Sequence, residues 1–357
     1  MDPKEFKNAV VGRDDLILIT GATGFIGSKL VKILLDYGFQ NLRCFVRPSS
    51  EAKKVEALQQ YRRCGAHVEV VEGNLLSHHD CLAATEGVAV IFHLAAGRGE
   101  KSFADAFLNS VVTTRNLLEA VIQHNCLKRF VNVSSFAVYT NRNKPRSRVL
   151  DESCPVEFRP ELRGDAYCFA KVKQERIVTE YESKFGIPCV TLRPGHVYGP
   201  GNEAISGRVG ISTFGLFLHL GGRNAIPFVY VDNCAEAIAL AGLTKGMNGE
   251  VFNVVDDEHP CSRKFLRLYK KRVRRFHSIY IPHFLSYVLC YFWERYSTWS
   301  AGQLPRAFNR LRWHAQWKST CYSNEKLKSL VGWTPKVPPM EALRLYFESC
   351  RDVGQHA

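Results

Sequence analysis

The stretch LILITGATGFIG, at residues 16–27, decides the fold class of this 357-residue chain. Its first four residues, 16–19, are apolar β-formers that predict a short buried strand. Gly21, Gly24 and Gly27 follow in a G-x-x-G-x-x-G pattern, and the amphipathic run SKLVKILLDYG after them predicts a helix. Glycines permit a tight strand-to-helix turn and a close approach of pyrophosphate to the backbone, where the helix N-terminus favours negative charge. The stretch therefore predicts a dinucleotide site, with an ordinary strand-to-helix turn as the alternative.

Four further apolar runs predict more strands, at residues 42–46, 67–76, 88–97 and 129–135. They alternate with helical segments, which is typical of an α/β fold with a doubly wound parallel sheet, the Rossmann arrangement. Small or uncharged residues near the ends of two of these runs leave room for a ribose or a nicotinamide. These residues are Asn74, Leu75, Leu94, Ala95 and Ala96.

Arg47 stands directly after the second strand, about where an NAD site usually has an acidic residue that binds the ribose 2′-hydroxyl. A guanidinium cannot accept that hydrogen bond, but its planar fork suits a 2′-phosphate. The residue therefore favours NADP over NAD as the cofactor. The alternative is a solvated surface arginine.

Tyr167 and Lys171 lie four residues apart in a helical segment, so they share one face of the helix. A free tyrosine has a pKa of about 10 and is a poor base at neutral pH. A nearby ammonium is expected to lower that pKa toward the working range. Ser135, at the end of a predicted strand, is placed to hydrogen-bond a substrate oxygen. These residues predict the catalytic group of a hydride-transfer enzyme, and the alternative is an amphipathic helix with a surface lysine.

Nine segments in this chain resemble the motifs of the extended short-chain dehydrogenase/reductases, the NAD-dependent epimerase/dehydratase family. They cover roughly residues 15–345 in the family's order. The segments are 20–27 (TGATGFIG), 93–96 (HLAA), 109–120 (NSVVTTRNLLEA), 131–139 (VNVSSFAVY), 167–171 (YCFAK), 192–201 (LRPGHVYGPG), 228–238 (FVYVDNCAEAI), 249–254 (GEVFNV) and 326–335 (KLKSLVGWTP).

The resemblance implies a role for each matching residue. Tyr167 is the general acid/base, Lys171 tunes it and holds the nicotinamide ribose, and Ser135 orients the substrate oxygen. Asn109 supports a relay water or the backbone near Lys171, and Asn74 replaces the aspartate that usually contacts adenine. The remaining implied cofactor-binding residues are Thr23, Phe25, Ile26, Pro194, Gly195 and Val197.

Two departures from family patterns bear on the substrate. Phe136 and Ala137 occupy the places of the Asp-Glu pair of sugar-nucleotide 4,6-dehydratases, and Ile226 and Pro227 occupy those of an Arg-Asp pair common in sugar-nucleotide epimerases. The chain therefore looks closer to the 3β-hydroxysteroid dehydrogenase and dihydroflavonol reductase branch.

We expect an NAD(P)-dependent oxidoreductase that interconverts a secondary alcohol and a ketone on an apolar, sterol-like or isoprenoid substrate. The alternative is a nucleotide-sugar 4-epimerase or 4-ketoreductase, in which Arg208, Arg223 or Arg306 reaches a phosphate. A non-catalytic dinucleotide sensor is a third class, disfavoured because Tyr167 and Lys171 are both present together with Ser135.

By the family's layout, residues 14–194 and 225–257 form the cofactor domain, and residues 195–224 and 258–350 form a smaller, mostly helical substrate domain. A homodimer is a further expectation. The twelve cysteines include no C-x-x-C pair and no Cys/His cluster, so we expect reduced thiols in a cytoplasmic enzyme and no metal site. The start of the chain has no apolar core region, so we expect no secretory signal.

Positive charge is concentrated between residues 261 and 320, which hold thirteen Lys and Arg and one acidic residue, Glu294. The net charge of this segment is +12, so it accounts for nearly all of the net charge of +14 of the whole chain. Residues 264–277 predict a basic helix, and residues 278–293 predict an apolar helix too short to span a membrane. The segment 264–293 is therefore a candidate for peripheral contact with an anionic membrane, with Ile281, Phe284, Tyr287, Val288 and Trp293 expected in the headgroup boundary. The alternative is that the apolar helix forms a substrate lid and the basic helix is a solvated face. Nucleic acid is not expected, because no recognition motif accompanies the charge.

Overall fold

The computed structural model describes residues 8–61, 65–97, 102–143, 145, 149–213, 215–300, 303 and 308–355. A seven-stranded parallel sheet lies at its centre, in the order β11-β6-β5-β4-β1-β2-β3. The strands are β1 (Leu16–Thr20), β2 (Asn41–Val46), β3 (His67–Glu72), β4 (Val88–His93), β5 (Arg129–Val133), β6 (Cys189–Pro194) and β11 (Val251–Val254). This is the doubly wound α/β fold that the sequence predicts.

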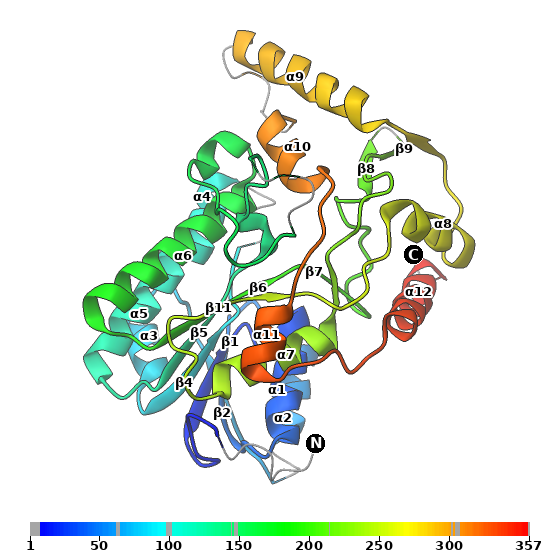
Figure 1. Cartoon of the computed structure of the whole chain (residues 1–357). Helices are drawn as coiled ribbons and strands as arrows, with labels where there is room; N and C mark the ends of the chain where they lie inside the picture. The colour runs from blue at the N-terminus through cyan, green and yellow to red at the C-terminus, as the bar shows by residue number, and fades with distance from the viewer. Residues whose placement is uncertain are drawn as a thin grey trace.

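Helices cover both faces of the sheet (Figure 1). One layer holds α1 (Phe25–Asp36), α2 (Ala52–Gln60), α7 (Val231–Leu243) and α11 (Glu325–Val331). The other holds α3 (His78–Thr85), α5 (Thr113–His124) and α6 (Ala166–Phe185), with α4 (Phe103–Phe107) and the π-helical turn η3 (Leu108–Val112) beside them.

Strand β1 illustrates why the central strands are mostly apolar rather than alternating. Ile17 and Ile19 pack into one core, while Leu18 between them packs into the other, and all three are fully buried. A strand with helices on both faces has no solvent side, so polar residues are excluded from both. Each such side chain contributes on the order of 1.5–3 kcal/mol by its burial.

The rest of the chain forms a mostly helical region at the carboxyl end of the sheet (Figure 1). Its elements are the pair β7 (His196–Tyr198) and β10 (Phe228–Tyr230), the sheet of β8 (Gly210–Thr213), β9 (Leu216–His219) and β12 (Ser278–Tyr280), and the helices α8 (Ser262–Arg272), α9 (His283–Trp299), α10 (Arg310–Gln316) and α12 (Pro339–Gln355). An aromatic core joins α8 and α12 to the β7–β10 pair through Phe265, Tyr346 and Phe228.

Several element boundaries differ from the sequence-based prediction. The first helix begins at Phe25 rather than residue 28, because Gly24 is its N-cap and Phe25 to Gly27 already have helical geometry. The run 278–293 is not one helix: β12 pairs with β9, and α9 starts only after Pro282 and extends to Trp299. Among the described residues, no helix combines the length and the apolar character needed to cross a bilayer.

Candidate active site

The turn between β1 and α1 leaves no space for side chains. Gly21 has φ +75°, and a Cβ added there would lie 3.0 Å from the Ala95 nitrogen. A Cβ on Gly27 would collide with the Gly21 carbonyl oxygen, and the Gly24 N–H donates to the same oxygen at 2.9 Å. The three glycines are therefore required by close backbone approach within the turn.

The N-terminus of α1 opens into this turn. Gly24 is extended and no side chain caps the helix, nor does its first turn contain an acidic residue. Thr23, Phe25 and Ile26 are half-buried around the turn, with Phe25 and Ile26 packed against the aromatic core. Uncapped N–H groups at a helix N-terminus are a favourable site for phosphate, so these residues fit a dinucleotide pyrophosphate.

Arg47 and Asn74 lie on neighbouring strands at the same edge of the sheet, because Val46 pairs with Glu72. Arg47 is exposed and makes no ion pair with the described residues. The Asn74 side-chain oxygen accepts from the Leu76 N–H at 3.0 Å, so its NH₂ group is the part able to contact a base. Leu75, next to it, is buried.

The ends of β4 and β6 supply the other half of the cofactor-binding edge. The N–H of Leu94 donates to the Thr20 carbonyl at 3.2 Å and that of Ala95 to the Thr20 hydroxyl at 3.3 Å, and Ala96 follows, half-buried. After Pro194 the Gly195 N–H donates to the Val254 carbonyl at 2.9 Å. A Cβ on Gly195 would collide with the Pro227 carbonyl oxygen. Val197 pairs with Val229 in the short β7–β10 ladder.

Tyr167, Ser135 and Lys171 meet at the same edge. Tyr167 lies in the first turn of α6, whose N-cap Asp165 accepts from the Cys168 N–H at 3.1 Å. The Ser135 and Tyr167 hydroxyls are in hydrogen-bond contact, and Ser135 also accepts from the Ala137 N–H at 3.1 Å. The Lys171 ammonium donates to the Val133 carbonyl at 2.7 Å.

The protonation of this group differs from the expectation based on sequence. Burial raises the pKa of Tyr167, and the hydrogen bond from Ser135 opposes that increase. Burial also lowers the pKa of Lys171 to about 8, although the negative charge of Glu175 acts to raise that pKa. The expected lowering of the Tyr167 pKa by Lys171 is not found, because the ammonium is directed to Val133 and Gln174 and desolvation dominates both groups.

A buried polar network behind Lys171 was not anticipated from the sequence. Lys171 donates to Gln174 at 2.9 Å, and Gln174 donates to the Thr114 hydroxyl at 3.1 Å. His93 lies 2.9 Å from that hydroxyl and 2.8 Å from the Thr20 hydroxyl, and burial lowers the pKa of His93 to about 3, so the ring is neutral. The only available sequence signal was the i,i+3 spacing of Lys171 and Gln174 on one helix.

Asn109 lies beside the same edge of the sheet, and its implied role stays a prediction. It lies in the π turn η3, and its NH₂ group donates to the Asp105 carbonyl at 3.0 Å and to the Asp105 carboxylate at 3.1 Å. No bond from Asn109 to the backbone near Lys171 is found within the described residues. Such π turns are frequent at functional sites. The Asn109 Cβ lies close to Gly97 at the end of β4.

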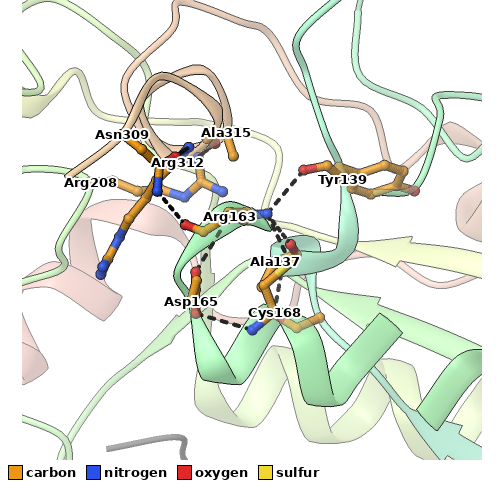
Figure 2. A network of polar contacts seen from close by, with 10 residues as sticks. Ala137, Tyr139, Arg163, Asp165, Cys168, Arg208, Asn309, Arg312 and Ala315 are labelled. Atoms are coloured by element: carbon orange, nitrogen blue, oxygen red, sulfur yellow. Dashed lines mark hydrogen bonds and ion pairs between the residues drawn. The ribbon is translucent and has the colours of Figure 1, made fainter. Parts of the chain in front are cut away.

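Arg163, which the sequence did not single out, ties the elements around Tyr167 together. Figure 2 shows its buried guanidinium between the Ala137 and Tyr139 carbonyls on one side and Asp165 on the other. Its own carbonyl accepts from the Asn309 side chain, at the start of α10, at 2.8 Å. The start of α6, the loop after β5 and α10 are thereby held in one network.

The three arginines considered for a substrate phosphate lie in different places. Arg208 is half-buried and donates to the Ala315 carbonyl at 3.1 Å (Figure 2). Burial lowers the pKa of His196 on β7 to about 4, and the charge of Arg208 adds to this effect. Arg223 is exposed in the turn after β9, and Arg306 lies outside the described residues. Within the described ranges, no group of three or more His, Cys, Asp or Glu is arranged to hold a metal ion.

Comparisons with known proteins find similar sequences and similar folds. The model of the NAD dependent epimerase/dehydratase family matches residues 17–254. GDP-mannose 3,5-epimerase 1 of Oryza sativa subsp. japonica is 30% identical over 258 residues, 68% of this chain and 64% of that protein. Cinnamoyl-CoA reductase 1 of the same subspecies is 30% identical over 198 residues, 55% of this chain and 57% of that protein. The match therefore spans less than two thirds of either relative.

Among solved structures, the fold is similar to that of UDP-glucuronic acid 4-epimerase from Bacillus cereus in complex with UDP-glucuronic acid and NAD. The TM-score is 0.71 at 21% identity, covering 95% of this chain and 99% of that chain. At this identity the likeness concerns the fold.

Proposed function

Because this chain belongs to the NAD dependent epimerase/dehydratase family, we propose that Ser135, Tyr167 and Lys171 catalyse hydride transfer between a nicotinamide and a secondary alcohol or ketone. The observation that carries the proposal is the hydroxyl contact between Tyr167 and Ser135, at the sheet edge that also holds the glycine turn. The nicotinamide, when bound, supplies or accepts the hydride.

Each residue has a role that its contacts favour. Tyr167 moves the proton at the substrate oxygen. Ser135 orients that oxygen in the complex, and before substrate binds it stabilises the Tyr167 phenolate by donating a hydrogen bond to the phenolate oxygen. Lys171, fixed by Val133 and Gln174, presents a positive charge to the cofactor ribose and to the developing phenolate. Arg163 holds the Ala137 and Tyr139 carbonyls and so positions the loop that carries Ser135.

The substrate class that the relatives favour is a nucleotide-linked sugar that is epimerised or reduced at a ring carbon. The rice epimerase and the Bacillus epimerase are both named for such sugars. Arg208 is half-buried, its charge acts on the buried His196 of β7, and it is a candidate to bind the diphosphate. Elimination of water is disfavoured, because Phe136 and Ala137 are not acids or bases.

An apolar alcohol or ketone is the second candidate, in line with the branch expected from the sequence. Ile226 and Pro227, which occupy the places of an epimerase-type Arg-Asp pair, are both buried and offer no charge to a diphosphate. The resemblance to a cinnamoyl-CoA reductase also favours a substrate with an apolar reacting end.

The cofactor is either NADP or NAD. Exposed Arg47 favours the 2′-phosphate of NADP, whereas the family and the Bacillus structure are described with NAD. A cytoplasmic location is supported by the eleven cysteines among the described residues, all of which are free thiols. The homodimer and the two-domain division stay predictions.

The experiment is a turnover assay with each cofactor against UDP-, GDP- and dTDP-linked sugars and a panel of apolar secondary alcohols. Reduced nicotinamide is followed by absorbance and products by NMR, with Tyr167→Phe as the inactive control. Conversion of a nucleotide sugar identifies the first substrate class. Turnover of apolar alcohols alone identifies the second, and equal activity in the Tyr167→Phe protein contradicts the catalytic assignment.

A further inference from the structure

Helix α9 turns its large apolar side chains toward solvent. Phe284 is 81% exposed, Phe292 62% and Trp299 79%. The outward apolar face consists of Phe284, Leu285, Leu289, Phe292, Tyr296 and Trp299. Soluble proteins rarely expose a contiguous apolar surface of this kind unless it binds something.

The opposite face of α9 is already packed, so its orientation is fixed. Ser286, Cys290 and Ser297 are buried there, and the Ser286 hydroxyl accepts from the Trp313 indole N–H at 2.9 Å. Tyr287 packs edge-on against Trp313 with ring centroids 5.1 Å apart. Loose docking of the helix therefore does not explain why its apolar side chains are exposed.

These contacts correct the lipid-facing residues expected from the sequence. Tyr287 packs against Trp313 and Trp293 packs against Phe308, so both point to α10 and the segment before it. Phe284 is exposed as expected. Which face of an apolar helix meets solvent depends on its tertiary partners, and the sequence alone did not specify them.

The chain leading into α9 is strongly basic. Residues 261–293 contain eight Lys and Arg and no Asp or Glu. Six of these cations are exposed on α8 and just after it, namely Lys264, Arg267, Lys271, Arg272, Arg274 and Arg275. Strand β12 joins α8 to α9 (Figure 1), and its Ile279 and Tyr280 are also exposed. Glu294, the first acidic residue after them, pairs with Arg310 at 2.9 Å on the packed side.

We propose that the outward face of α9 docks in the headgroup region of an anionic lipid bilayer, with the basic residues of α8 against the lipid phosphates. An amphipathic helix with an apolar face and neighbouring cations binds such an interface by burying the face and pairing the charges. A second copy of this chain is a poorer occupant, because it would bring two strongly positive segments together.

The test is sedimentation of the full-length protein with vesicles of phosphatidylcholine alone or mixed with phosphatidylglycerol, at low and high salt. We expect binding to the anionic vesicles at low salt, a reduction at high salt, and little binding to neutral vesicles. Fluorescence of Trp299 should shift to the blue on binding, and Trp299→Phe should remove that shift.

Two variants separate the apolar and electrostatic contributions. The triple change Phe284→Ser, Phe292→Ser and Trp299→Ser should abolish vesicle binding. Reversal of Lys271, Arg272, Arg274 and Arg275 to Glu should reduce the partition coefficient at least about a hundredfold, given about fivefold per cation. The matched control replaces Phe158, Phe185 and Met340, which are 78%, 54% and 60% exposed elsewhere on the protein, by Ser and should leave binding unchanged.

Two outcomes would overturn the proposal. One is no binding to anionic vesicles at low salt by protein that retains its circular dichroism. The other is a dimer in sedimentation velocity that the triple serine variant converts to monomer, which would assign the face to a second copy. Neither outcome depends on the substrate or on catalysis.

Discussion

Tyr167 is subject to two opposing influences on its pKa, burial and the hydrogen bond from Ser135. Replacing Ser135 by Ala removes the stabilising donor, so the pKa of Tyr167 should increase further. We expect Ser135→Ala to lose activity and to shift the pH profile of kcat/KM to higher pH. Both effects should be larger than in Ser135→Thr, which keeps the hydroxyl.

Replacing Tyr167 by Phe should reduce kcat about 10²–10⁴-fold, the usual contribution of a positioned proton donor, with cofactor binding retained.

Lys171 has a pKa of about 8, so its positive charge is lost as the pH increases through that value. We therefore expect kcat/KM to decline above about pH 8. Replacing Gln174 by Leu removes an acceptor that favours the charged form, which should move this decline to lower pH. Gln174→Glu should move it to higher pH. Identical profiles for both variants would mean that Gln174 has only a packing role.

Helix α6 and strand β6 are joined by a buried ion pair. Arg193 donates to Glu175 through two nitrogens at 2.9 and 2.7 Å, and a third donates to the Tyr139 hydroxyl at 3.0 Å. Tyr139 in turn donates to the Asn253 side chain on β11 at 2.7 Å. This network connects the helix that carries Tyr167 to two strands of the sheet, so it positions the catalytic helix.

Replacing Glu175 by Gln should therefore reduce the free energy of unfolding by about 3–5 kcal/mol, because it leaves the Arg193 charge buried without its partner. The measurement is urea unfolding followed by circular dichroism. The matched control is Glu348→Gln in the exposed Arg344–Glu348 pair of α12, which should change stability by less than about 0.5 kcal/mol. Equal effects of the two changes would show that burial of the first pair is unimportant.

At the scale of the whole molecule, the features that could be predicted from sequence are those with local causes. The glycine turn depends on backbone space within a few residues, and the Tyr167–Lys171 pairing depends on helical spacing. The His93 network and the Arg163 contacts were missed because their partners come from separate elements. The pKa of Tyr167 was misjudged for the same reason, since burial is a property of the folded chain and not of a motif.

The proposed dinucleotide site joins the ends of β1, β2, β4 and β6, so cofactor binding there should stabilise the whole fold. At a cofactor concentration a hundred times the dissociation constant, the free energy of unfolding increases by about 2.7 kcal/mol, which corresponds to an increase in Tm of a few degrees.

Because Arg47 is exposed and free of ion pairs with the described residues, we expect the larger increase with NADP. Arg47→Asp should abolish the NADP effect by repelling the 2′-phosphate and should preserve or enlarge the NAD effect. Thermal unfolding of both proteins with each cofactor is the measurement, and a larger NAD effect in the parental protein would refute the preference for NADP.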